Sequence, residues 1–175
     1  LNIDNCIYTG FQRSYSASDL ITDSAASGTA LATGEKTYNG AIAVDINGKP
    51  LEAITDHARK AGMRTGICTS CRIVDATPAV FSVNNENRDN LEELAASYID
   101  CNLDFIAGGG WHFFKEREDK RDILAEMAAN GFNVSTDPAS LDKAELPYIG
   151  LFASYELNPA LDRGDLARKE VAKAI

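Results

Sequence analysis

The sequence is poor in several features that would assign it to a specialised class. Its four cysteines, Cys6, Cys68, Cys71 and Cys101, are too few and too scattered for a disulfide scaffold, so they leave the redox compartment open. No apolar run is long enough to span a membrane, and no secretory signal is visible. Basic residues number only 17 against 26 acidic ones, and the net charge of −9 argues against a nucleic-acid-binding protein. A small phosphorylated substrate remains compatible with this charge, because local cations or metals can override the overall field.

The composition is that of one globular domain. Hydrophobic residues make up 45% and charged residues 25% of the 175 positions, which is typical of a soluble globular protein. The chain begins at Leu1 rather than at a methionine and stops at Ile175, inside an expected helix. We therefore expect residues 1–175 to be a single partial domain, truncated at both ends. The lack of a signal then says nothing about the compartment.

Helices and short apolar strands alternate along the chain. Amphipathic spacing predicts two helices that each lead into a strand, 51–61 with 63–70 and 121–130 with 132–135. Between them, a further helix is expected at 90–99, before a strand at 104–107. A fourth strand is expected at 148–153, and a last helix from Asp165 to Ile175. This alternation predicts an α/β fold with a mostly parallel central sheet flanked by helices, incomplete here. Functional residues of such sheets gather at the carboxyl ends of the strands.

The densest signal runs from Ile21 to Asp45, ITDSAASGTALATGEKTYNGAIAVD. Small residues fill positions 24–33, a composition typical of a helix that packs closely against neighbouring backbone. Ser24 is expected at the N-terminus of this helix, where unpaired N–H groups and the helix dipole favour an anion. From position alone, an ordinary helix-capping serine is the commoner explanation.

The run TDSAAS–TA–ATG–KTYNGAI–VD is similar, nearly residue for residue, to the nucleophile segment of the alkaline phosphatases. This resemblance implies that Ser24 attacks phosphorus and forms a phosphoserine intermediate. It also implies that Asp23 orients the arginine that binds the phosphate. Asp23 and Ser24 are therefore candidate catalytic residues.

Two further motifs match the same family in order and spacing. The first, Asp75-Ala76-Thr77-Pro78, resembles its magnesium-site motif, in which Asp75 is the acidic version of a position that is histidine in some members. In an extended chain the Asp75 and Thr77 side chains would point to one side and offer oxygen to a hard cation, although such a pair alone is more often a turn. The second is Arg88, thirteen residues after Asp75, at the family's spacing for the arginine that binds two phosphate oxygens.

The family resemblance implies two zinc ions and one magnesium ion. One zinc would lower the pKa of the serine hydroxyl, and the other would stabilise the leaving oxygen and later activate water. The zinc ligands and a further magnesium ligand would come from sequence outside this chain. Its two histidines, His57 and His112, match no ligand position, and His57 is expected on a helix surface.

The resemblance extends more loosely to the glycine turn Gly108–Gly110 and to the strand 148–153, so it covers nearly the whole chain. The implied function is hydrolysis of phosphate monoesters by the complete protein, and we expect the 175 residues alone to be close to inactive. Small phosphorylated substrates, a homodimer and a periplasmic or extracellular location are implied by the resemblance only.

Three other interpretations stay open. Cys68-Thr69-Ser70-Cys71 is a CxxC, the motif of thiol redox proteins, but it follows a strand instead of opening a helix. The Ser24 helix start and the Gly108–Gly110 turn could bind phosphate or a nucleotide without chemistry, although neither GxGxxG nor a Walker lysine is present. The third is a decayed, inactive paralogue, against which the intact set of site residues argues.

Overall fold

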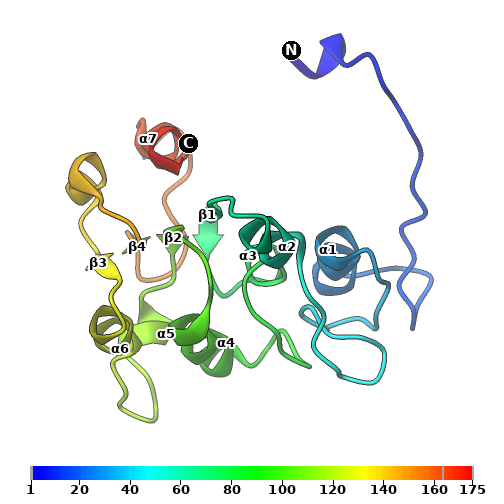
Figure 1. The fold of residues 1–175 in the computed structure, drawn as a ribbon, viewed down its shortest axis with the longest axis horizontal. Coiled ribbons are helices and arrows are strands. Elements are labelled where there is room, and N and C mark those ends of the chain that lie inside the picture. The colour runs from blue at the N-terminus through cyan, green and yellow to red at the C-terminus, as the bar shows by residue number, and fades with distance from the viewer. Residues whose placement is uncertain (1, 163, 175) are drawn as a thin grey trace.

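A computed structural model describes residues 2–162 and 164–174 of the chain. Its centre is one sheet of four parallel strands in the order β1-β2-β4-β3 (Figure 1). The strands are β1 (Gly66–Arg72), β2 (Phe105–Gly109), β3 (Asn133–Ser135) and β4 (Tyr148–Leu151). The predicted α/β fold with a parallel sheet is confirmed.

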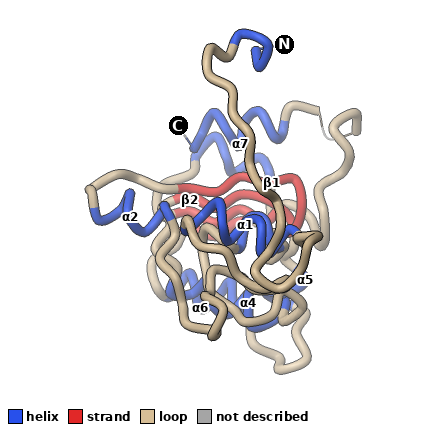
Figure 2. Tube along the Cα trace, turned by 90° about the vertical axis from the view of Figure 1, so that its right-hand side faces the viewer, coloured by secondary structure: helices blue, strands red, loops and turns tan. Residues whose placement is uncertain are grey.

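Helices lie on both faces of the sheet. The α-helices are α1 (Ser24–Thr33), α2 (Ile54–Lys60), α3 (Ala76–Ala79), α4 (Leu91–Ser97), α5 (His112–Lys115), α6 (Ile123–Ala129) and α7 (Leu166–Ala174). Short 3₁₀ helices span Asn2–Asn5, Tyr98–Asp100 and Pro138–Lys143. Figure 2 shows α7 on one face and α4 and α6 on the other, whereas α1 lies beyond the β1 edge, next to α3 (Figure 1). The predicted last residue of α7, Ile175, lies outside the described residues.

The core is divided between the two faces by the alternation of side chains along each strand. Phe105 and Ala107 of β2 belong to the smaller cluster, in which Leu141 is also buried and Leu166 of α7 packs at the margin. Ile106 points the other way, into the larger cluster, which contains residues of α4, α5 and α6. Buried apolar residues on both faces explain why β2 and β4 are completely buried.

The helix expected at 51–61 is shorter in the structure and does not pack as its pattern suggested. Helix α2 begins after Ala53, whose backbone N–H donates to Asp56 Oδ2 at 2.8 Å. None of the seven residues of α2 is buried, and Ile54 is 60% exposed. Its apolar residues Ile54 and Ala58 belong to neither hydrophobic cluster of the described residues, so the amphipathic pattern predicted the helix but not its exposure.

The glycine run after β2 differs from the expected turn, because β2 continues through Gly109. A Cβ on Gly108 would lie 2.8 Å from Thr69 Cγ2, and one on Gly109 would lie 2.0 Å from the Tyr155 carbonyl oxygen. These two glycines therefore permit the close approach of β1 and of the segment after β4. Only Gly110, with φ of 100°, turns the chain out of the strand.

The N-terminal segment before α1 extends away from the sheet as an arm (Figure 1). Its apolar side chains Ile7, Tyr8 and Phe11 are each more than 80% exposed. None of the described helices has the length and apolar character that crossing a membrane requires.

Candidate active site

The N-terminus of α1 presents Asp23 and Ser24 side by side. Asp23 is the N-cap in extended conformation, and its Oδ1 accepts the Ala26 N–H at 2.8 Å, so the capping function belongs to the aspartate. Ser24 is the first helical residue, as predicted, and its hydroxyl is not needed for the cap. The aspartate thus holds the helix start while the serine is left for another role.

Small residues bring α1 against its neighbours, as the composition suggested. A Cβ on Gly28 would lie 3.0 Å from Val80 Cγ2 at the end of α3, which limits this position to glycine or a small adjustment of the valine. Thr29 is fully buried, and its hydroxyl donates to the Ala41 carbonyl and accepts the Ala43 N–H. These contacts fix α1 to the chain that returns after it.

The loop after α1 completes the support of Asp23. The Gly40 N–H donates to Asp23 Oδ2 at 3.0 Å, and Asn39 Oδ1 accepts the Asp23 N–H at 3.2 Å. The Asn39 side chain also donates to the Ile21 carbonyl at 3.0 Å. Sequence reasoning assigned no role to Asn39 or Gly40, although the Asn-Gly pair is a recognisable turn signal that pointed to this loop.

Arg88 closes this arrangement from a distant part of the chain. Its Nη1 donates to Ser24 Oγ at 2.7 Å and lies 3.1 Å from Asp23 Oδ2. Its backbone N–H donates to the Gly40 carbonyl at 2.8 Å, so backbone and side chain are both anchored to the α1 segment. The structure therefore brings Asp23, Ser24 and Arg88 together. Both of these side-chain contacts are made through Nη1, while a guanidinium has five N–H donors in all.

The Asp75–Thr77 motif adopts a different local conformation from the extended one expected. Asp75 is the N-cap of α3, and Thr77 lies inside the first turn of that helix. Pro78 favours this outcome, since its fixed φ suits the first turn of a helix. Asp75 makes no capping hydrogen bond; its carboxylate binds Arg72, with Oδ1 2.6 Å from Nη2 and Oδ2 accepting the Arg72 N–H at 3.1 Å. This contact raises the pKa of Arg72 and keeps the guanidinium charged.

No group of three or more His, Cys, Asp or Glu side chains with the geometry of a metal site occurs among residues 2–162 and 164–174. His57 is exposed, with its Nε2 3.9 Å from Glu52. His112 Nδ1 lies 2.9 Å from Glu116 Oε2, and its ring stacks on Tyr155. Neither histidine is close to a set of zinc ligands in the part of the chain that is described.

The geometry of the CxxC motif disagrees with a thiol redox site. Cys68 and Cys71 both lie within β1, not at a helix N-terminus, and both are free thiols. Burial raises the pKa of Cys68 to about 11 and also raises the pKa of Cys71. A catalytic redox cysteine requires the opposite shift, because the thiolate is the reactive form.

Alkylation should therefore separate the cysteines by burial. At pH 8 we expect iodoacetamide to modify the exposed Cys6 first. Cys68 and Cys101, each with a pKa of about 11, should react at least tenfold more slowly, since only about one thiol in a thousand is ionised at that pH. Peptide mass spectrometry over time measures each rate. Fast labelling of Cys68 at pH 6 would restore the redox interpretation.

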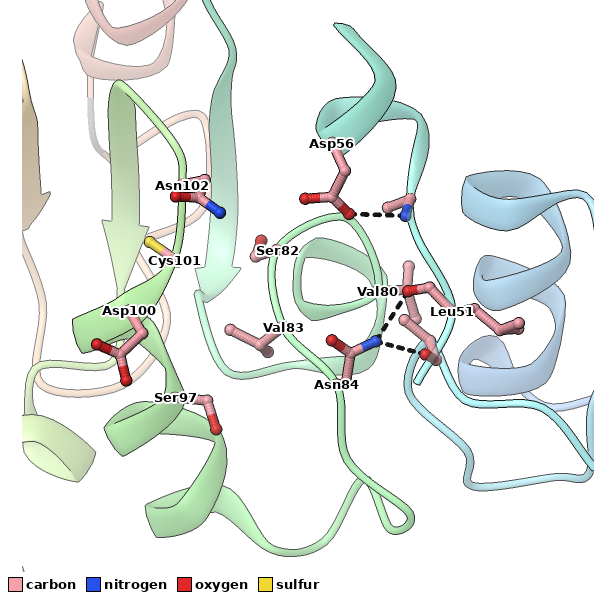
Figure 3. Close-up of a pocket in the computed structure, with 12 residues that line it drawn as sticks. Leu51, Asp56, Val80, Ser82, Val83, Asn84, Ser97, Asp100, Cys101 and Asn102 are labelled. Atoms are coloured by element: carbon pink, nitrogen blue, oxygen red, sulfur yellow. Dashed lines mark hydrogen bonds between the residues drawn. The ribbon is translucent and has the colours of Figure 1, made fainter. Parts of the chain in front are cut away.

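The Gly108–Gly110 segment is also unsuited to cradle a phosphate. Its exit amides are already used, because the N–H groups of Gly110 and Trp111 both donate to the Ala153 carbonyl, at 2.9 and 3.2 Å. A cavity of about 310 Å³ lies elsewhere, between α2 and α4, where Asp56 and Asn84 hydrogen-bond to backbone (Figure 3). Its lining includes none of Asp23, Ser24 or Arg88, so the candidate site is the α1 N-terminus and not this cavity.

Comparison with known proteins gives one consistent result. A sequence model of the family described as alkaline phosphatase matches residues 1–172. "Alkaline phosphatase 4" of Bacillus subtilis is 41% identical over 82% of this chain, and the alkaline phosphatase of Schizosaccharomyces pombe is 39% identical over 87%. The chain spans about a third of the length of these relatives, 32% in each case.

Solved structures agree with the sequence matches. A cold-active alkaline phosphatase from Shewanella sp. matches 94% of this chain and 42% of its own, with a TM-score of 0.84 and 38% identity. The alkaline phosphatase of the Antarctic bacterium TAB5 matches 94% of this chain and 52% of its own, with a TM-score of 0.82 and 33% identity. The chain belongs to the alkaline phosphatase family.

Proposed function

We propose that the full-length protein hydrolyses phosphate monoesters, with Ser24 as the nucleophile and Arg88 as the phosphate-binding residue. The observation that supports this most directly is the position of Arg88 Nη1, 2.7 Å from Ser24 Oγ and 3.1 Å from Asp23 Oδ2 at the start of a helix. A guanidinium and a helix N-terminus both favour a phosphate group next to the serine hydroxyl. Small phosphorylated molecules are the substrates that this arrangement suits.

The reaction proceeds in two displacements. Ser24 Oγ forms a bond to phosphorus, the bond from phosphorus to the ester oxygen breaks, and the alcohol leaves with a proton. A water oxygen then attacks the phosphoserine, Ser24 Oγ leaves and regains a proton, and inorganic phosphate is released. Arg88 binds the phosphate oxygens and stabilises the charge that develops on them, while Asp23 orients the guanidinium.

We also propose that the complete site uses zinc and magnesium. When bound, zinc lowers the pKa of the nucleophile and activates water, and magnesium adds positive charge near the phosphate. The described residues supply no zinc ligand set, so none of the steps above is assigned to zinc. Asp75 and Thr77 fit magnesium chemically, because both offer oxygen and Asp75 Oδ2 accepts a single backbone N–H in the structure. A His-to-Asp mutant of the TAB5 alkaline phosphatase has magnesium bound in its M3 site, which supports the proposal that this chain can contribute to a magnesium site.

Acid-quenched trapping tests the proposed intermediate. Full-length protein mixed with excess phosphate ester and quenched in acid should carry a phosphate on the peptide that contains Ser24, detected as a mass increase. Binding of inorganic phosphate without any phosphorylated peptide would favour the non-catalytic phosphate-binding module instead.

The 175 residues by themselves are expected to show no turnover of a chromogenic phosphate ester above background, with or without added zinc. The reason is that the serine hydroxyl is a poor nucleophile at neutral pH, and no described side chain is positioned as its base. A parallel assay of the full-length protein is the positive control. Zinc-dependent turnover by the chain alone that disappears in Ser24→Ala would contradict this expectation.

On the family resemblance we further propose that the protein is a homodimer and acts in the periplasm or outside the cell. Size-exclusion chromatography with light scattering measures the first property, and fractionation of cells that express the full-length protein measures the second.

A further inference from the structure

Arg72 lies between two carboxylates at the carboxyl end of β1. Its Nη2 is 2.6 Å and its Nε 2.9 Å from Asp75 Oδ1, and the same Nε is 3.2 Å from Glu156 Oε1. The guanidinium carbon lies 5.7 Å from the centre of the Phe113 ring. The Arg72 guanidinium thus contacts one carboxylate that is largely buried and one that is more exposed, since the side chains of Asp75 and Glu156 are 20% and 55% exposed.

Three separate elements create this arrangement. Arg72 is the last residue of β1, Asp75 stands at the N-cap position of α3, and Glu156 belongs to the segment after β4. The Leu157 N–H donates to the Ser70 carbonyl at 2.9 Å, which holds the Glu156 segment against β1. The position of Glu156 beside Arg72 is therefore fixed by backbone contacts and does not depend on the ion pair alone.

The contact with Arg72 occupies the Asp75 carboxylate, which could otherwise cap α3 or bind a divalent cation. Asp75 stands at an N-cap position but makes no capping bond, because its oxygens face Arg72. A divalent cation on the same carboxylate would lie near a guanidinium whose Nη2 is 2.6 Å from Asp75 Oδ1, and two positive charges that share one carboxylate repel each other. Cation binding is therefore opposed for as long as Arg72 holds Asp75, and Glu156 is an anionic partner already in reach of the guanidinium.

We propose that Arg72 is a built-in competitor for the Asp75 carboxylate, which sets the affinity of the site for Mg²⁺, and that Glu156 accepts the guanidinium when the cation binds. This inference rests on the proposed role of Asp75 as a magnesium ligand. It assigns to Arg72 a positioning role, since the guanidinium acts on the cation through Asp75.

The test is a calorimetric titration of metal-depleted full-length protein with Mg²⁺. Arg72→Gln should bind Mg²⁺ about tenfold more tightly than the wild type, the effect of removing roughly one charge-assisted hydrogen bond that the cation must displace. Arg121→Gln is the matched control, because Arg121, just before α6, also pairs with one carboxylate through Nε and Nη2, at 2.9 and 2.6 Å from the two oxygens of Glu126. An unchanged or weaker affinity in Arg72→Gln, with the control at wild-type affinity, overturns the proposal.

A double-mutant cycle tests the part played by Glu156. Glu156→Gln alone should weaken Mg²⁺ binding about threefold to tenfold, because the guanidinium then loses its alternative partner. In the Arg72→Gln background the same change should have little effect. An equal loss in both backgrounds would mean that Glu156 acts through its charge alone and would overturn its assigned role.

Two further variants keep the outcomes distinguishable. Asp75→Asn should lose most of the Mg²⁺ affinity; if it does not, the proposed magnesium role of Asp75 fails, whatever Arg72 does. If Asp75→Asn loses affinity and Arg72→Gln gains none, only the competitor role fails. Arg72→Lys keeps the positive charge but not the planar pair of N–H donors. It serves as a second variant if Arg72→Gln proves less stable. Its Mg²⁺ affinity should lie between those of wild type and Arg72→Gln.

Discussion

Replacing Ser24 by alanine is expected to lower the kcat of the full-length protein by about 10³-fold or more, because the variant has no oxygen that can form the phosphoenzyme. The fold should survive the change. Asp23 and not Ser24 caps α1, and alanine is the residue best suited to a helix interior. A steady-state assay with a phosphate monoester measures kcat, and the acid-quenched peptide should lose its added phosphate at the same time.

Ser27→Ala is the matched control for this prediction. Ser27 lies in the same helix, three residues further on, and its hydroxyl donates to the Asp23 carbonyl at 2.8 Å. Its removal should change kcat less than threefold, since a serine hydroxyl bonded to the preceding turn adds little to helix stability. If Ser24→Ala retained more than a tenth of the wild-type rate, the nucleophile would have to be another group.

The local parts of this site could be predicted from sequence because they depend on neighbours in the chain. The helix start at Ser24 could be predicted from the run of small residues that begins there, although the sequence suggested Ser24 and not Asp23 as the cap. The parallel sheet follows from alternating helices and apolar strands. The resemblance to the alkaline phosphatases pointed to Arg88 through its spacing from Asp75, since 64 positions separate Arg88 from Ser24 and no local pattern connects them.

The parts that were missed depend on contacts between distant segments. Nothing near Gly109 in the sequence indicates that the Tyr155 carbonyl oxygen occupies the space that a Cβ on residue 109 would need. The glycine run was therefore interpreted as a turn. Likewise, the apolar residues of α2 have helical spacing, but whether Ile54 is exposed depends on which other elements pack against the helix. The ion pair between Asp75 and Arg72 depends on the conformation of the β1–α3 connection. The sequence predicted an extended conformation for Asp75-Ala76-Thr77 and therefore did not indicate this ion pair.

Arg88→Ala is expected to lower kcat/KM by about a hundredfold, with most of the loss in phosphate binding, since a guanidinium held in place contributes roughly 1.5–3 kcal/mol per charged hydrogen bond. Inhibition by inorganic phosphate should weaken to a similar degree, because the product uses the same contact. The surrounding loop should persist, as the Arg88 backbone N–H still donates to Gly40 and Asp23 still accepts from Ala26 and Gly40.

The conservative variant separates charge from geometry at this position. Arg88→Lys keeps a positive charge but cannot donate to two phosphate oxygens in the fork arrangement, so it should recover only part of the loss, to about tenfold below wild type. Arg59→Gln, which removes an exposed arginine paired with Asp104 at 3.2 Å, should leave kcat/KM and phosphate inhibition unchanged. Equal activity of Arg88→Ala and wild type would show that Arg88 contacts Ser24 in the free protein but does not bind the substrate. Another cation would then have to bind the phosphate.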